Sequence, residues 1–248
     1  MSHFKKRFGH SDLSAGNLIC AIGSYFLGAP YEPGTLEIGH KEKLIVNFVQ
    51  FDCFTFVETV LALTGCVADD QITLQEFRRQ LQFIRYRNGV IDGYSSRLHY
   101  FTDWLRDNVQ KKILRDISRE LGAVNLRKKI NYMTTQRSAY SALRDENKFK
   151  KMLLVEKNIS RRIFYVIDEN KIGQIKNEIK NGDIIAFTAN TEGLDVAHVG
   201  FALWQGGNLH LLHASSKEGK VIVSKKTLAA YLKQNKKFTG FIVARPLL

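Results

Sequence analysis

The chain has 248 residues, of which 44% are hydrophobic and 25% are charged. This balance excludes a disordered or low-complexity chain and allows a substantial buried core. The 37 Lys and Arg residues outnumber the 24 Asp and Glu residues and give a formal net charge of +13. The excess favours an acidic partner such as nucleic acid, anionic lipid or a polymer rich in carboxylates. Much of it lies in residues 106–180, where 19 Lys and Arg accompany 9 Asp and Glu, a pattern typical of a solvated face.

Cysteine content and hydropathy further narrow the class of protein. Cys20, Cys53 and Cys66 form no CxxC pair and lack the spacing of a zinc knuckle or a disulfide framework. We therefore expect at least one free thiol. No stretch reaches the about eighteen uninterrupted apolar residues that a membrane span needs, so no membrane span is predicted.

The first predicted element is an amphipathic helix. Basic residues at 5–7 precede an uncharged stretch, 13–31, that superficially imitates a secretory signal. Polar residues interrupt this stretch, and its large apolar residues recur at helical spacing behind a candidate cap at Ser14. Two of the three prolines follow in residues 28–34, which we expect to form a fixed loop that ends the helix.

A second helix is predicted to begin at Cys53. Residues 55–63 contain no Gly or Pro, and Asp52 is a natural capping residue just before them. A cysteine in the first turn of a helix meets the positive end of the helix dipole, which favours the nucleophilic thiolate. Unpaired backbone N–H groups there can also hold an oxyanion. The alternative for any free cysteine is a small buried hydrophobe, and this alternative is retained for Cys20 and Cys66.

Residues 73–163 are predicted to form an inserted, mostly helical lobe. Leu74, Phe77, Leu81 and Ile84 recur at helical spacing, and a second stripe comprises Leu98, Phe101 and Leu105. After Asn181 the periodicity changes to two or to short apolar runs, which predicts strands. These strands are 184–188, 198–204, 209–214, 221–224 and 240–244, and residues 206–208 are expected to link the second and third as a hairpin.

A cysteine nucleophile needs a base and a group that orients the base, and histidines are the natural suppliers. The sequence has seven. Three lie in polar contexts that we expect to be poorly ordered, and a fourth lies on a predicted helix, where a surface or core role is favoured over catalysis. These four are His3, His10, His40 and His99.

The other three histidines fall on the predicted hairpin. His198 opens one strand, and its partner strand carries His210 and His213, which point to opposite faces because their separation is odd. We expect His213 to lie opposite His198, and His210 to lie near Phe201, away from Cys53. Cys53, His198 and His213 could also bind zinc, but no carboxylate base is evident beside them, so no metal is predicted.

Several segments together resemble the NlpC-type papain-like cysteine peptidases that cut bacterial peptidoglycan. The first set comprises residues 27–31, Asp52-Cys53, 181–185, 197–200 and 213–215. Longer segments look like the N-acetylmuramoyl-L-alanine amidase-like subfamily, and the resemblance runs from about Leu13 to Pro246. They are residues 33–37, 51–63, 97–100 and 193–198.

The resemblance implies a role for each residue of the site. It makes Cys53 the nucleophile, His198 the base and His213 the residue that orients the base, with Tyr31 and Asp52 bordering the substrate pocket. Many members have Asp-Cys-Ser-Gly at the nucleophile, whereas this chain has Phe54 after Cys53. That serine commonly helps to bind a free peptide amine. Its replacement favours the subfamily's amidase role, in which the bond between the lactyl group of muramic acid and L-Ala is cut.

The sequence therefore predicts an α+β fold. A papain-like core, with the Cys53 helix packed on an antiparallel sheet, is expected in one domain over residues 1–248 with an insertion at about 73–163. The expected function is cofactor-free hydrolysis of an amide in a peptidoglycan fragment or muropeptide. Alternatives are an endopeptidase or acyltransferase with the same three residues, or a non-catalytic basic module that binds nucleic acid or lipid. The last lacks the interleaved aromatic and basic residues of a single-strand groove, so no nucleic acid is predicted.

The compartment and the oligomeric state stay open at this point. The resemblance implies the periplasm or cell envelope if a signal peptide has been removed, and the cytoplasm otherwise.

Overall fold

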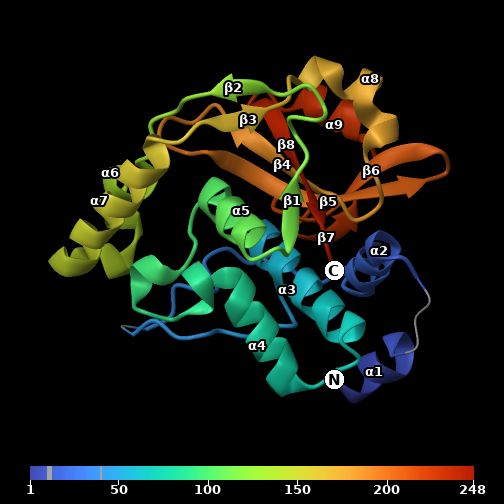
Figure 1. Ribbon diagram of the computed structural model, residues 1–248, viewed down its shortest axis with the longest axis horizontal. Helices are drawn as coiled ribbons and strands as arrows, with labels where there is room; N and C mark the ends of the chain where they lie inside the picture. Colours follow the sequence, from blue (N-terminus) through green and yellow to red (C-terminus); the bar gives the residue numbers. More distant parts are fainter. Residues whose placement is uncertain (10–12, 40) are drawn as a thin grey trace.

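A six-stranded antiparallel sheet with the strand order β1-β8-β4-β5-β6-β7 forms the centre of the computed structural model, which describes residues 1–9, 13–39 and 41–248 (Figure 1). The strands are β1 (Leu114–Asp116), β4 (Ile184–Ala189), β5 (Val196–Gln205), β6 (Asn208–Ser215), β7 (Lys220–Val223) and β8 (Phe238–Pro246). A separate ribbon pairs β2 (Val124–Leu126) with β3 (Phe164–Val166). Helices and an antiparallel sheet are combined as expected for an α+β fold.

Helices cover both faces of the sheet. They are α1 (Ser2–Phe8), α2 (Ala15–Tyr25), α3 (Cys53–Ala68), α4 (Leu74–Arg85), α5 (Phe101–Gln110), α6 (Tyr132–Thr135), α7 (Glu146–Ser160), α8 (Ile172–Ile175) and α9 (Leu228–Gln234). None of the helices in the described part of the chain is long and apolar enough to cross a membrane.

The sheet separates two apolar clusters, as the alternation along β4 shows. Ile184 and Ala186 belong to the cluster that contains α2 and α3, whereas Ile185 and Phe187 belong to the cluster that contains α8 and α9. Successive side chains of a strand point to opposite faces, so a strand that is buried on both faces reads as a continuous apolar run. β4 is therefore buried throughout and forms a rigid centre for the neighbouring strands.

The helix that begins at Cys53 is confirmed, and its first turn is closed by a capping box. Asp52 Oδ1 accepts hydrogen bonds from the N–H groups of Phe54 (3.0 Å) and Thr55 (2.7 Å), and the Asp52 N–H donates to Thr55 Oγ1 at 3.0 Å. Such a box satisfies donors that the helix itself leaves unpaired. Asp52 thus fixes the position of Cys53 relative to the rest of the helix.

The segment 73–163 is mostly helical, as its sequence predicts, but it also contains short strands. α4, α5 and α7 are present, but Leu114–Asp116 forms a strand that pairs with β8 at the edge of the main sheet. A strand of three residues is too short to show a period of two, which is why the apolar pattern did not reveal it. Leu74 is exposed, whereas the other three residues of its predicted stripe are buried.

Strands predicted after Asn181 are confirmed as β4 to β8, and the predicted first helix is α2, which begins after Ser14. The short elements α1, α8 and α9 were not predicted. His3 lies within α1, whereas His10 and His40 lie outside the described residues.

A buried ion pair joins α3 to α4. Arg85 Nε donates to Glu58 Oε2 at 2.7 Å, both side chains are almost completely buried, and Arg85 Nη1 donates to the carbonyl of Ile45 at 2.7 Å. A buried ion pair gains little net stability, but removal of one partner leaves an uncompensated buried charge.

We predict that Arg85→Met lowers the free energy of unfolding by about 3–5 kcal/mol. Arg85→Met combined with Glu58→Leu is expected to lose much less, because no charge is then left without its partner. Denaturant unfolding followed by circular dichroism measures both variants. Equal losses in the single and double variants would show that this ion pair does not couple the two helices.

Candidate active site

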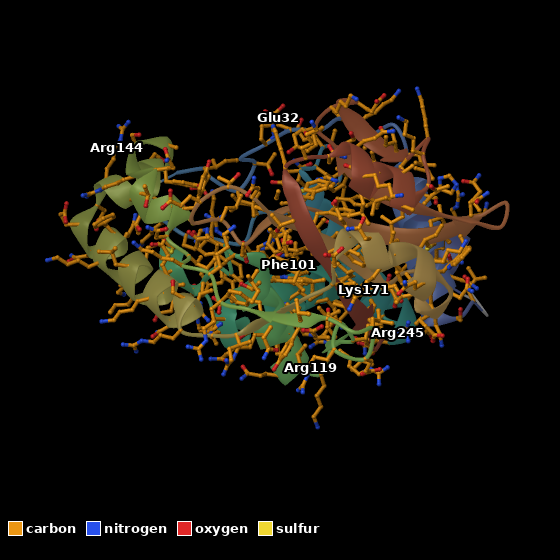
Figure 2. The ribbon with its side chains drawn as sticks, turned by 90° about the horizontal axis from the view of Figure 1, so that it is seen from above. Glu32, Phe101, Arg119, Arg144, Lys171 and Arg245 are labelled. Atoms are coloured by element: carbon orange, nitrogen blue, oxygen red, sulfur yellow. The ribbon has the colours of Figure 1, made fainter. Side chains whose placement is uncertain are left out.

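Cys53 and His198 come from different elements and line one cavity. Cys53 is the first residue of α3 and is half-buried, while His198 lies near the start of β5. The cavity has a volume of about 130 Å³. Its walls are formed by Cys53, Phe54, His99, Phe101 and residues 194–199. Figure 2 places Phe101 near the middle of the molecule, far from Arg144 at the end that carries α7. The structure therefore brings the predicted nucleophile and base to the same cavity.

The thiol of Cys53 is held in its neutral form. Burial, followed by the nearby carboxylate of Asp52, raises the pKa of Cys53 to about 12, against smaller opposing effects of the Val199, Cys53 and Phe54 N–H groups. The sequence-based expectation of a helix-start thiolate is thus wrong for the free protein, because desolvation exceeds the effect of the helix terminus. Burial also raises the pKa of Cys20 and of Cys66 to about 12.

Backbone donors at this helix start are also fewer than the sequence predicts. The N–H groups of Phe54 and Thr55 both donate to Asp52 Oδ1 and so are not free to hold an oxyanion. The Cys53 N–H is not used by this cap.

His198 and His213 form a direct hydrogen bond. Nε2 of His198 lies 2.6 Å from Nδ1 of His213, and the two ring planes are almost perpendicular, at 82°. Burial and the neighbouring His213 lower the pKa of His198 to about 3, and burial lowers the pKa of His213 to about 4. Both imidazoles are therefore neutral near neutral pH, and one nitrogen of the pair donates while the other accepts.

The contact between these rings arises from a different strand register than the sequence predicts. The hairpin turn is the two residues Gly206 and Gly207, both with positive φ (56° and 73°), and Gln205 pairs with Asn208. This register pairs Phe201 with Leu212, so that His213 does not lie directly opposite His198. The predicted register is wrong because the turn contains two residues rather than three.

Gly200 allows the two rings to meet diagonally. A Cβ atom at position 200 would lie 2.8 Å from His213 Cβ and 2.9 Å from the carbonyl oxygen of Leu212. Positions 198 and 200 share one face of β5. The missing side chain at 200 therefore leaves room for the His213 ring, which reaches along the sheet to His198.

Aromatic rings enclose the histidine pair. Phe187 lies directly across from His198 in the sheet and stacks with it at 6.0 Å and 14°. Tyr231, on α9, contacts the His213 ring edge-on at 5.5 Å and also lies 6.4 Å from the His198 ring. Tyr231 was not predicted as part of the site. The capping residue Thr227 and the buried Leu228 and Leu232 of α9 are the pattern that could have indicated this helix.

Tyr31 and Asp52 lie close to Cys53 but are not among the residues that line the cavity. Tyr31 pairs with Phe51 through a parallel bridge, which places it beside the start of α3. Burial, followed by the nearby Cys53 and Asp52, raises the pKa of Tyr31 to about 12, so its hydroxyl keeps its proton.

His99 and Asp195 belong to the cavity wall, although the sequence did not mark them as site residues. The prediction that His99 lies on a helix is wrong. His99 lies in the connection between the 3₁₀ turn Tyr94–Ser96 and α5. The helical stripe had been extended back to Leu98, because its apolar spacing continues through this connection. Asp195 is buried and accepts hydrogen bonds from the Thr102 N–H (2.7 Å) and hydroxyl (2.8 Å) and from the Val196 N–H.

His210 lies apart from this site, as predicted, although its strand partner is Leu203 rather than Phe201. Its Nδ1 lies 2.8 Å from the carbonyl oxygen of Ser224. Within the described residues, no group of three or more His, Cys, Asp or Glu side chains could hold a metal ion. His198 and His213 bond to each other through facing nitrogens instead of converging on a common point.

Comparison with protein families identifies the class. Residues 21–241 match the family described as AmiA-like, N-acetylmuramoyl-L-alanine amidase-like. The chain belongs to this N-acetylmuramoyl-L-alanine amidase-like family. No curated protein matches the chain.

Solved structures agree with this assignment. An N-acetylmuramoyl-L-alanine amidase from Bacteroides uniformis ATCC 8492 is 39% identical, with a TM-score of 0.89 over 94% of this chain and 98% of that chain. A Bacteroides fragilis protein described as a candidate xylanase is 42% identical, with a TM-score of 0.86 over 91% of this chain and 99% of that chain. A Legionella pneumophila protein, at 23% identity and a TM-score of 0.76 over 100% of this chain and 94% of that chain, shares the fold.

The low pKa of His213 predicts a loss of stability in acid. Between pH 6.5 and about 4, the unfolded chain binds a proton at this residue that the folded protein does not bind. The contribution of His213 to the free energy of unfolding is therefore fully present above pH 6.5. It decreases as the pH falls below 6.5, by roughly 1.4 kcal/mol per pH unit. In denaturant titrations, His213→Asn is expected to depend less steeply on pH than the wild type. The same pH dependence of stability in both proteins would contradict a low pKa for His213.

Proposed function

We propose that this protein is a cysteine-dependent amidase with a papain-like core formed by residues 1–248 as one domain. Its substrate is a peptidoglycan fragment, and the bond cut joins the lactyl group of muramic acid to L-Ala. One observation carries the proposal: Cys53 and His198 line one cavity, and His198 Nε2 lies 2.6 Å from His213 Nδ1. Membership of the amidase-like family supports the choice of substrate.

In the proposed reaction, His198 acts as the base. His198 donates its Nε2–H to His213 Nδ1, which leaves His198 Nδ1 free to accept the proton of the Cys53 thiol. The sulfur attacks the lactyl carbonyl carbon as it loses this proton, and His198 then gives the proton to the leaving nitrogen of L-Ala. A water molecule, deprotonated by His198, attacks the thioester and releases the muramic acid carboxylate and the free thiol.

The neutral resting state suits this sequence of proton transfers. With a thiol pKa of about 12 and an imidazole pKa of about 3, proton transfer from Cys53 to His198 is unfavourable until the substrate carbonyl accepts the sulfur. The N–H of Cys53 and the protonated hydroxyl of Tyr31 are the proposed donors to the oxyanion. Both hydrogen-bond groups lie at the start of the nucleophile helix or beside it.

The apolar wall next to Cys53 supports cleavage at the lactyl amide rather than beside a free amine. Phe54 lines the cavity and packs against Trp104 with ring centroids 5.4 Å apart. Asp195 is the acidic residue in that wall, and its two oxygens already accept hydrogen bonds from Thr102 and Val196. A charged ammonium placed against the Phe54 ring loses hydrogen bonds to water, because this apolar surface offers no acceptor.

The acidic side chains near the cavity also disfavour hydrolysis of a glycoside, the activity that the description of the Bacteroides fragilis relative suggests. Glycosidases generally place two carboxyl groups on either side of the bond they cut. Here Asp195 is held by Thr102, and Asp52 caps α3. An acyltransferase would use the same Cys53, His198 and His213, and is recognised by transfer of the muramoyl group to an added amine.

The net charge of +13 has a role in this proposal through attraction of stem peptides that carry several carboxylates. Arg119 and Arg144 illustrate how such residues lie on the outer surface (Figure 2). A non-catalytic basic module would instead retain DNA or anionic vesicles in a salt-dependent manner and leave Cys53 without a function.

Substitutions of the site residues are expected to separate chemistry from folding. Cys53→Ala should fold normally and lose activity by about 10⁴-fold or more, and His213→Ala should lose a substantial part of it. His210→Ala is the matched control on the same strand and should retain most activity, because its ring bonds the Ser224 carbonyl away from the cavity. Mass spectrometry of muropeptide products measures all three. An inactive His210→Ala with an active His213→Ala would reverse the assignment.

The bond choice is predicted separately from the catalytic residues. Given equal concentrations of an N-acetylmuramoyl peptide and a free L-Ala-γ-D-Glu-containing peptide, the protein should release the L-Ala peptide from the first and leave the second largely intact. The physical reason is the cost, on the order of 1–3 kcal/mol, of an unsatisfied ammonium against the Phe54 wall. Efficient cleavage after D-Glu in the free peptide would show an endopeptidase with the same residues.

A further inference from the structure

His99 occupies the wall of the catalytic cavity and has no role in the proton transfers proposed above. Its side chain is half-buried and lines the same cavity as Cys53 and His198. It comes from the connection that precedes α5, a part of the chain separate from both α3 and β5. His99 is thus a second histidine in the cavity, beside His198, and its chemistry depends on which of its nitrogens carries the hydrogen.

The hydrogen bonding of His99 fixes its tautomer. Nε2 of His99 lies 2.9 Å from the carbonyl oxygen of Tyr94. A carbonyl oxygen can only accept, so Nε2 must carry the hydrogen. Burial, together with the positive charge of Arg97, holds the pKa of His99 well below its usual range. The ring is therefore neutral, and its Nδ1 is a bare acceptor.

The ring of His99 is also fixed in place by its surroundings. It packs on the ring of Tyr94, with centroids 4.4 Å apart. The Tyr94 hydroxyl donates to Glu37 at 3.1 Å, and Arg97 is paired with Glu37 (2.7 Å) and Glu42 (3.0 Å). These bonds anchor the part of the chain that immediately precedes His99. An acceptor held this firmly loses little conformational entropy when it binds a donor.

Nδ1 is the nitrogen that remains available. Among the described residues, no protein group donates to Nδ1 of His99, and this atom is not one of the buried polar atoms left without a partner. Nδ1 is therefore not sealed from solvent, and His99 is one of the residues that line the cavity. Because the ring is neutral and its only unused nitrogen accepts, it suits an N–H or O–H group and does not attract a carboxylate.

We propose that Nδ1 of His99 accepts a hydrogen bond from an amide N–H or hydroxyl of the substrate next to the scissile carbonyl. This contact makes His99 a substrate-positioning group that holds the carbonyl carbon in front of Cys53. It rests on the proposed amidase function. It adds a polar recognition point to a cavity whose Phe54 and Phe101 side is apolar.

Two substitutions separate this role from a purely structural one. In His99→Gln, the side-chain amide N–H can still reach the Tyr94 carbonyl, but no acceptor replaces Nδ1. In His99→Asn, the side-chain oxygen lies near the position of Nδ1, but the side chain is too short to reach Tyr94. Substrate recognition by Nδ1 predicts that Gln is the more damaging change for activity. A structural role of the Tyr94 bond predicts that Asn is the more damaging change.

The assay uses N-acetylmuramoyl-L-alanyl-D-isoglutamine as substrate. We expect His99→Gln to keep the thermal stability of the wild type while kcat/KM falls about tenfold or more, and His99→Asn to be less stable but more active than His99→Gln. Wild-type activity in His99→Gln, or lower activity in His99→Asn than in His99→Gln, overturns the proposal. If the wild type itself does not cleave the substrate, the proposed function fails first, and this outcome is distinct from a selective failure at His99.

A second measurement does not require a folded variant at position 99. In ¹⁵N-histidine-labelled Cys53→Ala protein, the spectrum should show His99 protonated at Nε2 and bare at Nδ1. Addition of the same muramoyl dipeptide should shift the Nδ1 resonance towards that of a hydrogen-bonded nitrogen. A proton on Nδ1 in the free protein, or no change at Nδ1 when the dipeptide binds, contradicts the proposal.

Discussion

The hydrogen bond between His198 and His213 is the interaction on which the rest of the site depends. It requires two strands of one hairpin, a glycine at position 200 that leaves space for a ring, and aromatic residues that pack around the two imidazoles. Burial makes both imidazoles neutral, and a neutral pair can share one proton while leaving a second nitrogen free to act as a base. The sheet that presents these rings is rigid because apolar clusters pack against both of its faces.

Asp52 links the stability of the fold to the chemistry of Cys53. Its carboxylate caps α3 and fixes the thiol at the start of the helix, yet its negative charge adds to the burial that raises the pKa of Cys53. The capping bonds also occupy two of the backbone donors that a developing oxyanion could otherwise use. In the proposed reaction the neutral thiol loses its proton only as a substrate carbonyl accepts the sulfur, which limits reactions with other electrophiles.

Much of this arrangement was predictable from local chemistry, and the rest depended on contacts between distant residues. Asp52 before an uninterrupted helical run predicted the start of α3, and period-two patterns predicted β4 to β8. The meeting of His198 and His213 was predicted, but its register was not, because the turn length had to be known to one residue. β1 was missed because three residues carry no period, and His99 was missed because an apolar stripe continued across a loop. The balance between burial and helix dipole at Cys53 could not be weighed before its burial was known.

The central claim is that Cys53 is acylated by the muramoyl side of the substrate, and a trapped intermediate tests it most directly. Rapid acid quenching during turnover of an N-acetylmuramoyl peptide, followed by digestion and mass spectrometry, should find the peptide that contains Cys53 heavier by the muramoyl acyl group, with the L-Ala peptide already released. His198→Ala protein treated in the same way should carry no adduct. An adduct that contains L-Ala and D-Glu would contradict the bond assignment, and turnover with no adduct at Cys53 under any quench time would contradict the nucleophile.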